Sequence, residues 1–66
     1  MLFAKRLREL RLERGLSQEK LAEIAGLHRN YVGVLERSVS SATLDAIYKL
    51  AAALKVRPAE LLENLP

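Results

Sequence analysis

The sequence contains no cysteine and no tryptophan, and its only histidine is His28. Without cysteine the chain forms no disulfide and has no thiol redox chemistry. A lone histidine with no neighbouring ligands argues against a structural metal, so we expect neither a metal nor a cofactor. A chain of 66 residues has a small core and often needs such a support. With no disulfide and no metal expected, we expect the fold to be stabilised by association with a second copy of the chain.

Long apolar runs are absent as well. No stretch approaches the roughly 20 apolar residues that cross a bilayer, and no basic segment followed by an apolar one marks a signal peptide. We therefore expect a cytoplasmic protein with no membrane partner. Two prolines, three glycines and no repeats leave no obvious linker. Residues 1–66 are therefore expected to form a single domain.

The net charge of +3 is unevenly distributed. Residues 1–37 carry eight Lys or Arg against five Asp or Glu, whereas residues 38–66 carry three of each kind. A basic half suits a polyanionic partner. Ordinary solubilising charge on helix surfaces explains a charge of this size equally well, so charge alone does not determine the function.

The apolar periodicity is helical throughout, and no period-2 alternation predicts a strand. We expect an all-α fold of five short helices, over residues 3–14, 18–25, 29–37, 44–54 and from 58 onward. Capping residues mark the helix ends: Ser17 and Thr43 before a helix, Pro58 at a first helical position, and Gly15 and Gly26 after a helix.

The inward faces follow from the same spacing. In the first helix the stripe comprises Phe3, Leu7, Leu10 and Arg14, and Leu12 falls outside it. The remaining core positions are expected to be Leu21, Ala22, Ile24, Ala25, Leu27, Val32, Leu35, Leu44, Ile47, Leu50, Ala51 and Leu54, with Tyr31 at the margin.

The helices 18–25 and 29–37 are joined by a short turn that contains Gly26. This is the spacing of a helix-turn-helix motif, and in its DNA-binding form the second helix enters the major groove. Arg29 and Asn30 are expected in the first turn of that helix, where Arg can bond guanine and Asn can bond adenine. Val34, one turn later, can contact a thymine methyl, and Gly33 leaves the backbone open. The alternative is a solvated helix face with one stray valine.

Contacts with the DNA backbone are expected on both sides of this helix. Ser17 and Gln18 begin the 18–25 helix, whose N–H groups point at anions, and His28 either caps the next helix or touches phosphate. A polar patch suited to phosphate follows: Arg37, Ser38, Ser40 and Ser41. The alternatives are that Ser17 only caps, that Gln18 is solvated and that the serines form an ordinary loop.

The segments LSQEKLAE, HRNYV, LER and KLAAALKV together resemble the helix-turn-helix domain of phage Cro and C1 repressors. Restriction–modification controller proteins, which share this small size, are also similar. The similarity covers residues 3–63 and implies a lambda-repressor-like fold and sequence-specific binding to double-stranded DNA. It implies base contacts by the residues matching Arg29, Asn30 and Val34.

The resemblance also implies a partly buried ion pair between Arg11 and Glu36, which would join the first helix to the recognition helix. The pair is reasonable on physical grounds, because a carboxylate on the inner side of a helix needs a partner. The sequence departs from the family pattern at Gly33, Ser38, Ala42 and Arg57. Gly33 should weaken its helix by roughly 0.5–1 kcal/mol, and it puts in doubt any base contact at that position.

Members of this family usually bind as two-fold dimers on half-sites about 34 Å apart. The C-terminal part has more apolar surface than five short helices need, so we expect a homodimer interface at Val56, Leu61, Leu62 and Leu65. The alternative is that Leu61 and Leu62 both pack on the first helix. We expect no small-molecule effector, so that regulation depends on protein concentration.

An enzyme is not expected, because the sequence offers no cysteine, one histidine and no Gly-rich phosphate loop. The alternative function is an antitoxin-type protein-interaction module that also binds DNA. A separate toxin-binding tail would distinguish it, and we see none. A net charge of only +3 and the lack of a Lys-rich tail disfavour an RNA-binding or chromatin-like protein.

Overall fold

The computed structural model describes residues 2–37 and 42–62, and every regular element within these ranges is a helix. In chain order the helices are α1 (Leu2–Glu13), α2 (Gln18–Ala25), α3 (Tyr31–Arg37), α4 (Leu44–Leu54) and α5 (Pro58–Leu62). The predicted all-α fold of five helices is confirmed. None of these helices is long and apolar enough to span a membrane.

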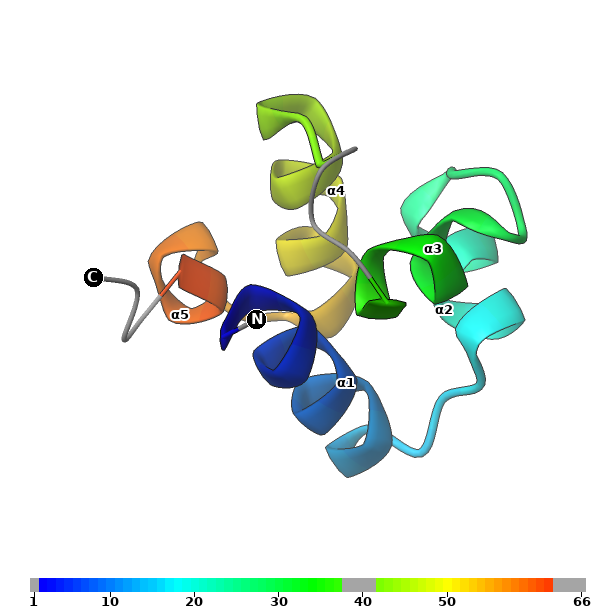
Figure 1. Cartoon of the computed structure of the whole chain (residues 1–66), viewed down its shortest axis with the longest axis horizontal. Helices are drawn as coiled ribbons and strands as arrows, with labels where there is room; N and C mark the ends of the chain where they lie inside the picture. The colour runs from blue at the N-terminus through cyan, green and yellow to red at the C-terminus, as the bar shows by residue number, and fades with distance from the viewer. Residues whose placement is uncertain (1, 38–41, 63–66) are drawn as a thin grey trace.

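The fourth helix, α4, runs through the middle of the molecule (Figure 1). It packs against both α2 and α5, and α1 packs against α3 and α5. The pair α2 and α3 lies on the right of the view, and α5 lies on the left (Figure 1). The helix-turn-helix pair therefore sits on one side of a scaffold made by α1, α4 and α5.

The core consists of aliphatic side chains contributed by all five helices, together with Phe3 of α1. Its fully enclosed members are Leu7, Leu21, Val32, Leu35, Leu50, Leu54 and Leu61. Burying one such side chain contributes about 1.5–3 kcal/mol relative to leaving it in water, so these residues are the main source of stability. Phe3, Leu7 and Leu10 form the expected stripe of α1, and Leu12 is exposed as predicted.

Three inward assignments are wrong. Arg14, the last residue of the stripe predicted for the first helix, follows the end of α1 and is exposed. Ile24 is 50% exposed and Leu44 is 69% exposed. Ile24 lies at the edge of the apolar side of α2, where Leu21 and Ala22 take the buried positions. Leu44 lies in the first turn of α4, where Ala46 is buried in its place. Periodicity locates the centre of an apolar stripe better than its edges.

The helix ends are held by the predicted caps. The Oγ of Ser17 accepts the N–H of Lys20 at 3.0 Å, and the Oγ1 of Thr43 accepts the N–H of Ala46 at 3.1 Å. Gly26 ends α2 in the left-handed conformation with φ of 73°. At the end of α4 the same conformation is taken by Lys55, with φ of 61°. A residue with a Cβ is strained there.

Replacing Lys55 with glycine is expected to raise the free energy of unfolding by about 1 kcal/mol, because glycine adopts positive φ without steric strain. Urea denaturation followed by circular dichroism measures the change. Lys49→Gly, inside α4, is the matched control and should lower the free energy of unfolding by about 1 kcal/mol. A Lys55→Gly protein no more stable than the wild type would contradict the prediction.

Candidate nucleic-acid interface

The turn between α2 and α3 is shaped by the end of α2. The N–H of Gly26 donates to the carbonyl of Glu23 at 3.2 Å, and the N–H of Leu27 donates to the carbonyl of Ala22 at 2.9 Å. This pair of bonds is a Schellman cap. Leu27 then packs against the core, as predicted, and Ala22 is fully buried. The chain is thereby directed from α2 into α3 through a short turn.

The helix α3 begins at Tyr31, two residues later than the sequence predicts. The Nδ1 of His28 accepts the N–H of Asn30 at 3.1 Å, and the carbonyl of His28 accepts the N–H of Tyr31 at 2.9 Å. These two bonds fold residues 28–31 into a tight turn. Arg29 and Asn30 are therefore exposed on the turn that leads into α3, and the prediction that they lie in its first helical turn is wrong.

One face of α3 continues outward from this turn. Asn30, Val34 and Arg37 follow at spacings of four and three, which places them on the same side of the helix. Val34 is half-buried, and Arg37 is exposed. Neither Arg29 nor Arg37 has a carboxylate partner within residues 2–37 and 42–62. The face therefore carries an unpaired positive charge near each end, which suits a polyanion.

Arg11 and Glu36 lie together on the inner side of α3. The Nε of Arg11 donates to Oε2 of Glu36 at 2.6 Å, and its Nη2 donates to Oε1 at 3.1 Å. The two side chains are only 9% and 6% exposed. The Nη1 of Arg11 donates to the carbonyl of Leu16 at 2.8 Å. Arg11 thus connects α1, the segment before α2 and α3.

Gln18 extends this network to the surface. Its Nε2 donates to Oε1 of Glu36 at 3.1 Å, and its amide lies over Gly33. A Cβ built on Gly33 would be 3.1 Å from Oε1 of Gln18 and 3.4 Å from Nη1 of Arg37. The prediction that Gly33 leaves the backbone open is therefore wrong, because Gly33 is buried beneath these two side chains.

The remaining predicted residues divide into three groups. Ser17 is exposed at the start of α2, where its Oγ serves as the cap. Three residues of the predicted phosphate patch and one of the predicted dimer interface lie outside the described residues: Ser38, Ser40, Ser41 and Leu65. Val56 and Leu62 are partly buried against the core.

The assignment of Leu61 to the dimer interface is corrected. Its side chain is fully buried within the chain, and it belongs to the same core cluster as Leu7 and Leu54. It has no surface to offer to a second copy.

Sequence reasoning missed the contact of Gln18 with Gly33 and Glu36. Gly33 and Glu36 are three residues apart, so they share one side of α3, and this spacing was the only signal in the sequence. Gln18 reaches them only because α2 packs against α3. A local pattern carries no information about such a packing.

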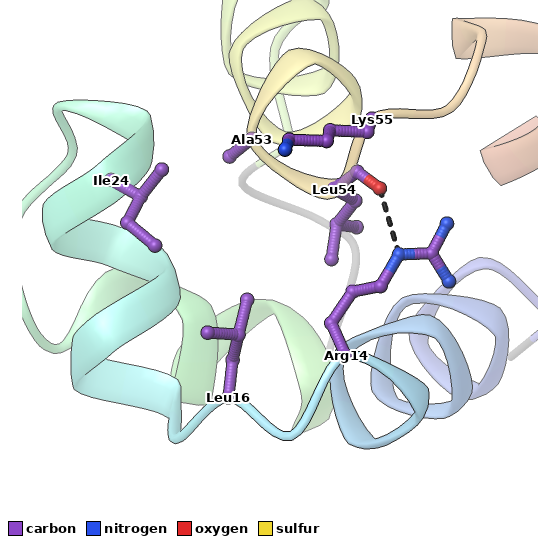
Figure 2. A pocket seen from close by; sticks show the side chains of 6 residues that line it. All are labelled: Arg14, Leu16, Ile24, Ala53, Leu54 and Lys55. Carbon is purple, nitrogen blue, oxygen red and sulfur yellow. Dashed lines mark hydrogen bonds between the residues drawn. The ribbon is translucent and has the colours of Figure 1, made fainter.

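A separate pocket of about 300 Å³ lies between α2 and the ends of α1 and α4 (Figure 2). Leu16, Ile24 and Leu54 line it, with Arg14 and Lys55 beside them. The Nε of Arg14 donates to the carbonyl of Leu54 at 2.9 Å, so this arginine caps the end of α4 (Figure 2). No residue predicted to contact DNA lines this pocket. Ile24 is exposed because it faces this opening.

The chain belongs to the helix-turn-helix family, whose model matches residues 7–61. This confirms the predicted Cro/C1-type family. Control protein C.BamHI of Bacillus amyloliquefaciens is 42% identical over 64 residues, which are 96% of this chain and 79% of that protein. The restriction–modification controller protein C.AhdI from Aeromonas hydrophila, solved by crystallography, is 54% identical. That alignment covers 89% of each chain with a TM-score of 0.85.

A third relative is SinR, the master regulator for biofilm formation, in a crystal structure with DNA. It is 31% identical, and the alignment covers 92% of this chain and 98% of that chain with a TM-score of 0.85. The relatives are control proteins and transcription regulators. They confirm the expectation that this chain is not an enzyme.

Replacing either partner of the ion pair, as in Arg11→Met or Glu36→Met, leaves one buried charge without a counter-charge. Each change is expected to lower the free energy of unfolding by about 3–5 kcal/mol. The double replacement should recover most of this loss, because it removes both charges. Thermal unfolding followed by circular dichroism tests this. A double variant less stable than both single variants would show that the residues do not act as a pair.

Proposed function

We propose that this chain is a sequence-specific DNA-binding transcription regulator that reads bases with α3 and the turn before it. The proposal rests on one observation: Arg29 and Asn30 are exposed where the turn enters α3, and Val34 follows Asn30 on the same side of the helix. The major groove admits an α-helix. In this arrangement Arg29 bonds guanine, Asn30 bonds adenine, and Val34 contacts a thymine methyl.

The same pose brings further polar groups near the phosphates. Ser17 and His28 each use one acceptor within the chain, because the Oγ of Ser17 accepts from Lys20 and the Nδ1 of His28 accepts from Asn30. The hydroxyl proton and the Nε2 edge of the imidazole are left for a phosphate oxygen. Gln18 and Arg37 complete the proposed backbone contacts among the described residues. The phosphate contacts predicted for Ser38, Ser40 and Ser41 lie outside the described residues and stay predictions.

The relatives support the proposal at two levels. SinR shares this fold and has been solved in a complex with DNA. The 54% identity to C.AhdI and the 42% identity to C.BamHI favour a control protein of a restriction–modification system over other members of the family.

We also propose that the protein binds a pseudo-palindromic operator as a homodimer. One α3 reads only a few base pairs, and two copies related by a two-fold axis place their helices about 34 Å apart in successive major grooves. Apolar surface for such an interface is present on α4, where Leu44 and Tyr48 are exposed by 69% and 59%. Val56 and Leu62, after α4 and in α5, add partly buried apolar surface.

Selection of bound duplexes from a randomised pool, followed by sequencing, tests the reading of bases. The wild type is expected to select a two-fold symmetric site. Arg29→Ala is expected to lose preference at one base pair in each half-site, since one such contact is worth about 1–3 kcal/mol. Lys5→Ala, which removes one exposed positive charge from α1, is the control and should keep the full preference. Weak, strongly salt-dependent and unselective binding by the wild type would contradict the proposal.

Sedimentation equilibrium tests the homodimer. Leu44→Gln is expected to weaken self-association by about a hundredfold or more, because two copies of the side chain leave the interface and each buried leucine contributes about 1.5–3 kcal/mol. Leu12→Gln, at an exposed leucine of α1, is the matched control and should leave association unchanged. A wild type that is monomeric at micromolar concentration would contradict the homodimer. If Leu44→Gln associates as strongly as the wild type, the dimer interface does not include the exposed face of α4.

A further inference from the structure

Gly33 lies in the middle of α3, a helix of only seven residues. Glycine is a poor helix former, and among the described residues only Gly15 and Gly26 are glycines with positive φ. The backbone of Gly33 is ordinary helix, so its conformation does not require glycine. The other physical reason for a glycine is that neighbouring side chains occupy the space that a Cβ would need.

Two side chains fill that space. A Cβ on Gly33 would lie 3.1 Å from Oε1 and 3.6 Å from Cδ of Gln18, and 3.4 Å from Nη1 of Arg37. The shortest of these distances is below ordinary van der Waals contact, so any side chain at position 33 would push the amide of Gln18 outward. The missing side chain therefore allows Gln18 and Arg37 to approach the same point on α3.

The amide of Gln18 is fixed from its other side. Its Nε2 donates to Oε1 of Glu36 at 3.1 Å, and the carboxylate of Glu36 is held by two hydrogen bonds from Arg11. Gly33 and Glu36 are one helical turn apart, so both contacts of Gln18 lie on one side of α3. The orientation of the amide is thus determined before any ligand arrives.

Gln18 and Arg37 each keep hydrogen-bond donors that no described residue uses. The amide nitrogen of Gln18 has two N–H groups; one donates to Glu36, and the other has no acceptor within the described parts of the chain. The guanidinium of Arg37 has no carboxylate partner there either. The amide atom of Gln18 nearest Gly33 is Oε1, and the second N–H is carried by Nε2. This N–H and the guanidinium of Arg37 are both donors, and a phosphate group can accept from both and neutralise the charge.

We propose that Gly33 is a positioning residue, which allows Gln18 and Arg37 to hold one DNA phosphate between them over α3. This inference rests on the proposed DNA-binding function and deepens it. Gly33 makes no base contact in this arrangement. It acts through Gln18, so it affects the affinity for every sequence alike and leaves base preference unchanged.

Nuclear magnetic resonance of the full chain without DNA tests the positioning. Gln18 is the only glutamine, and Asn30 and Asn64 carry the only other side-chain amides, so the signals of the Gln18 amide are easily assigned. We expect a nuclear Overhauser contact between these amide protons and the Hα protons of Gly33. In Gly33→Ala the amide signals should move toward those of a solvated glutamine. A wild type without this contact overturns the proposal.

Binding to the duplex selected by the wild type tests the phosphate contact. Gly33→Ala and Gln18→Ala are each expected to bind about tenfold more weakly, with unchanged base preference. The slope of log K against log salt should change little, because the amide of Gln18 carries no charge and Arg37, which neutralises the phosphate, is retained in both variants. The double variant should bind DNA no more weakly than the weaker-binding of the two single variants, because both changes remove the same contact.

Three results would overturn the proposal: full affinity of Gly33→Ala, additive losses in the double variant, or loss of preference at one base pair in Gly33→Ala. The last would mean that the backbone at Gly33 faces a base. Gln18→Ala keeps the phosphate contact testable if Gly33→Ala folds poorly. A wild type that selects no site overturns the proposed function and the phosphate contact together. The amide signals, measured without DNA, distinguish that failure from a failure of the positioning.

Discussion

Arg11 and Glu36 form a bidentate ion pair from which water is almost excluded, between α1 and the inner side of α3. Removing two charges from water is unfavourable unless their geometry is good and their other donors and acceptors are satisfied. Both conditions hold, because the remaining nitrogen of Arg11, Nη1, donates to the carbonyl of Leu16. No buried side-chain nitrogen or oxygen in the described ranges lacks a partner. The pair therefore tolerates only a narrow range of positions for α3 relative to α1.

The same carboxylate links the interior of the protein to its proposed DNA surface. Glu36 accepts from Arg11 below and from Gln18 above, so the side chain at the start of α2 is oriented by a pair that begins in α1. Gly33 leaves the space in which that orientation is possible. A shift of α3 against α1 would therefore be transmitted to Gln18 and from there to the groups proposed to contact phosphate.

The short helix α3 depends on the contacts made by Arg11 and Glu36 and on its own buried side chains. An isolated helix of seven residues is not stable in water. Val32 and Leu35 are fully buried and attach α3 to the core, and His28 fixes the turn ahead of it with two hydrogen bonds. The result is a rigid inner face and an outer face free for contacts. Arg29 and Asn30 can be presented to DNA because they precede the helix and take no part in the core.

The local chemistry of the sequence determined the number of helices, their caps and the centres of their apolar faces. Ser17, Gly26 and Thr43 act through atoms three or four residues away. The apolar residues of α1 and α4, such as Leu7 and Leu50, recur along their helices with the helical period. The pairing of Arg11 with Glu36 was accessible only through the resemblance to a known family, since no pattern connects residues 25 positions apart.

Only the tertiary structure decided the edges of those faces and the surroundings of Gly33. Ile24 and Leu44 are exposed because no neighbouring helix covers them, and Gly33 is buried because the side chain of Gln18 crosses from another helix. Leu61, which was expected in the dimer interface, is buried in the core because α5 packs against α1 and α4. The physical reason is range. Capping and periodicity act within one or two helical turns, whereas burial at the edge of a helix depends on segments distant in the chain.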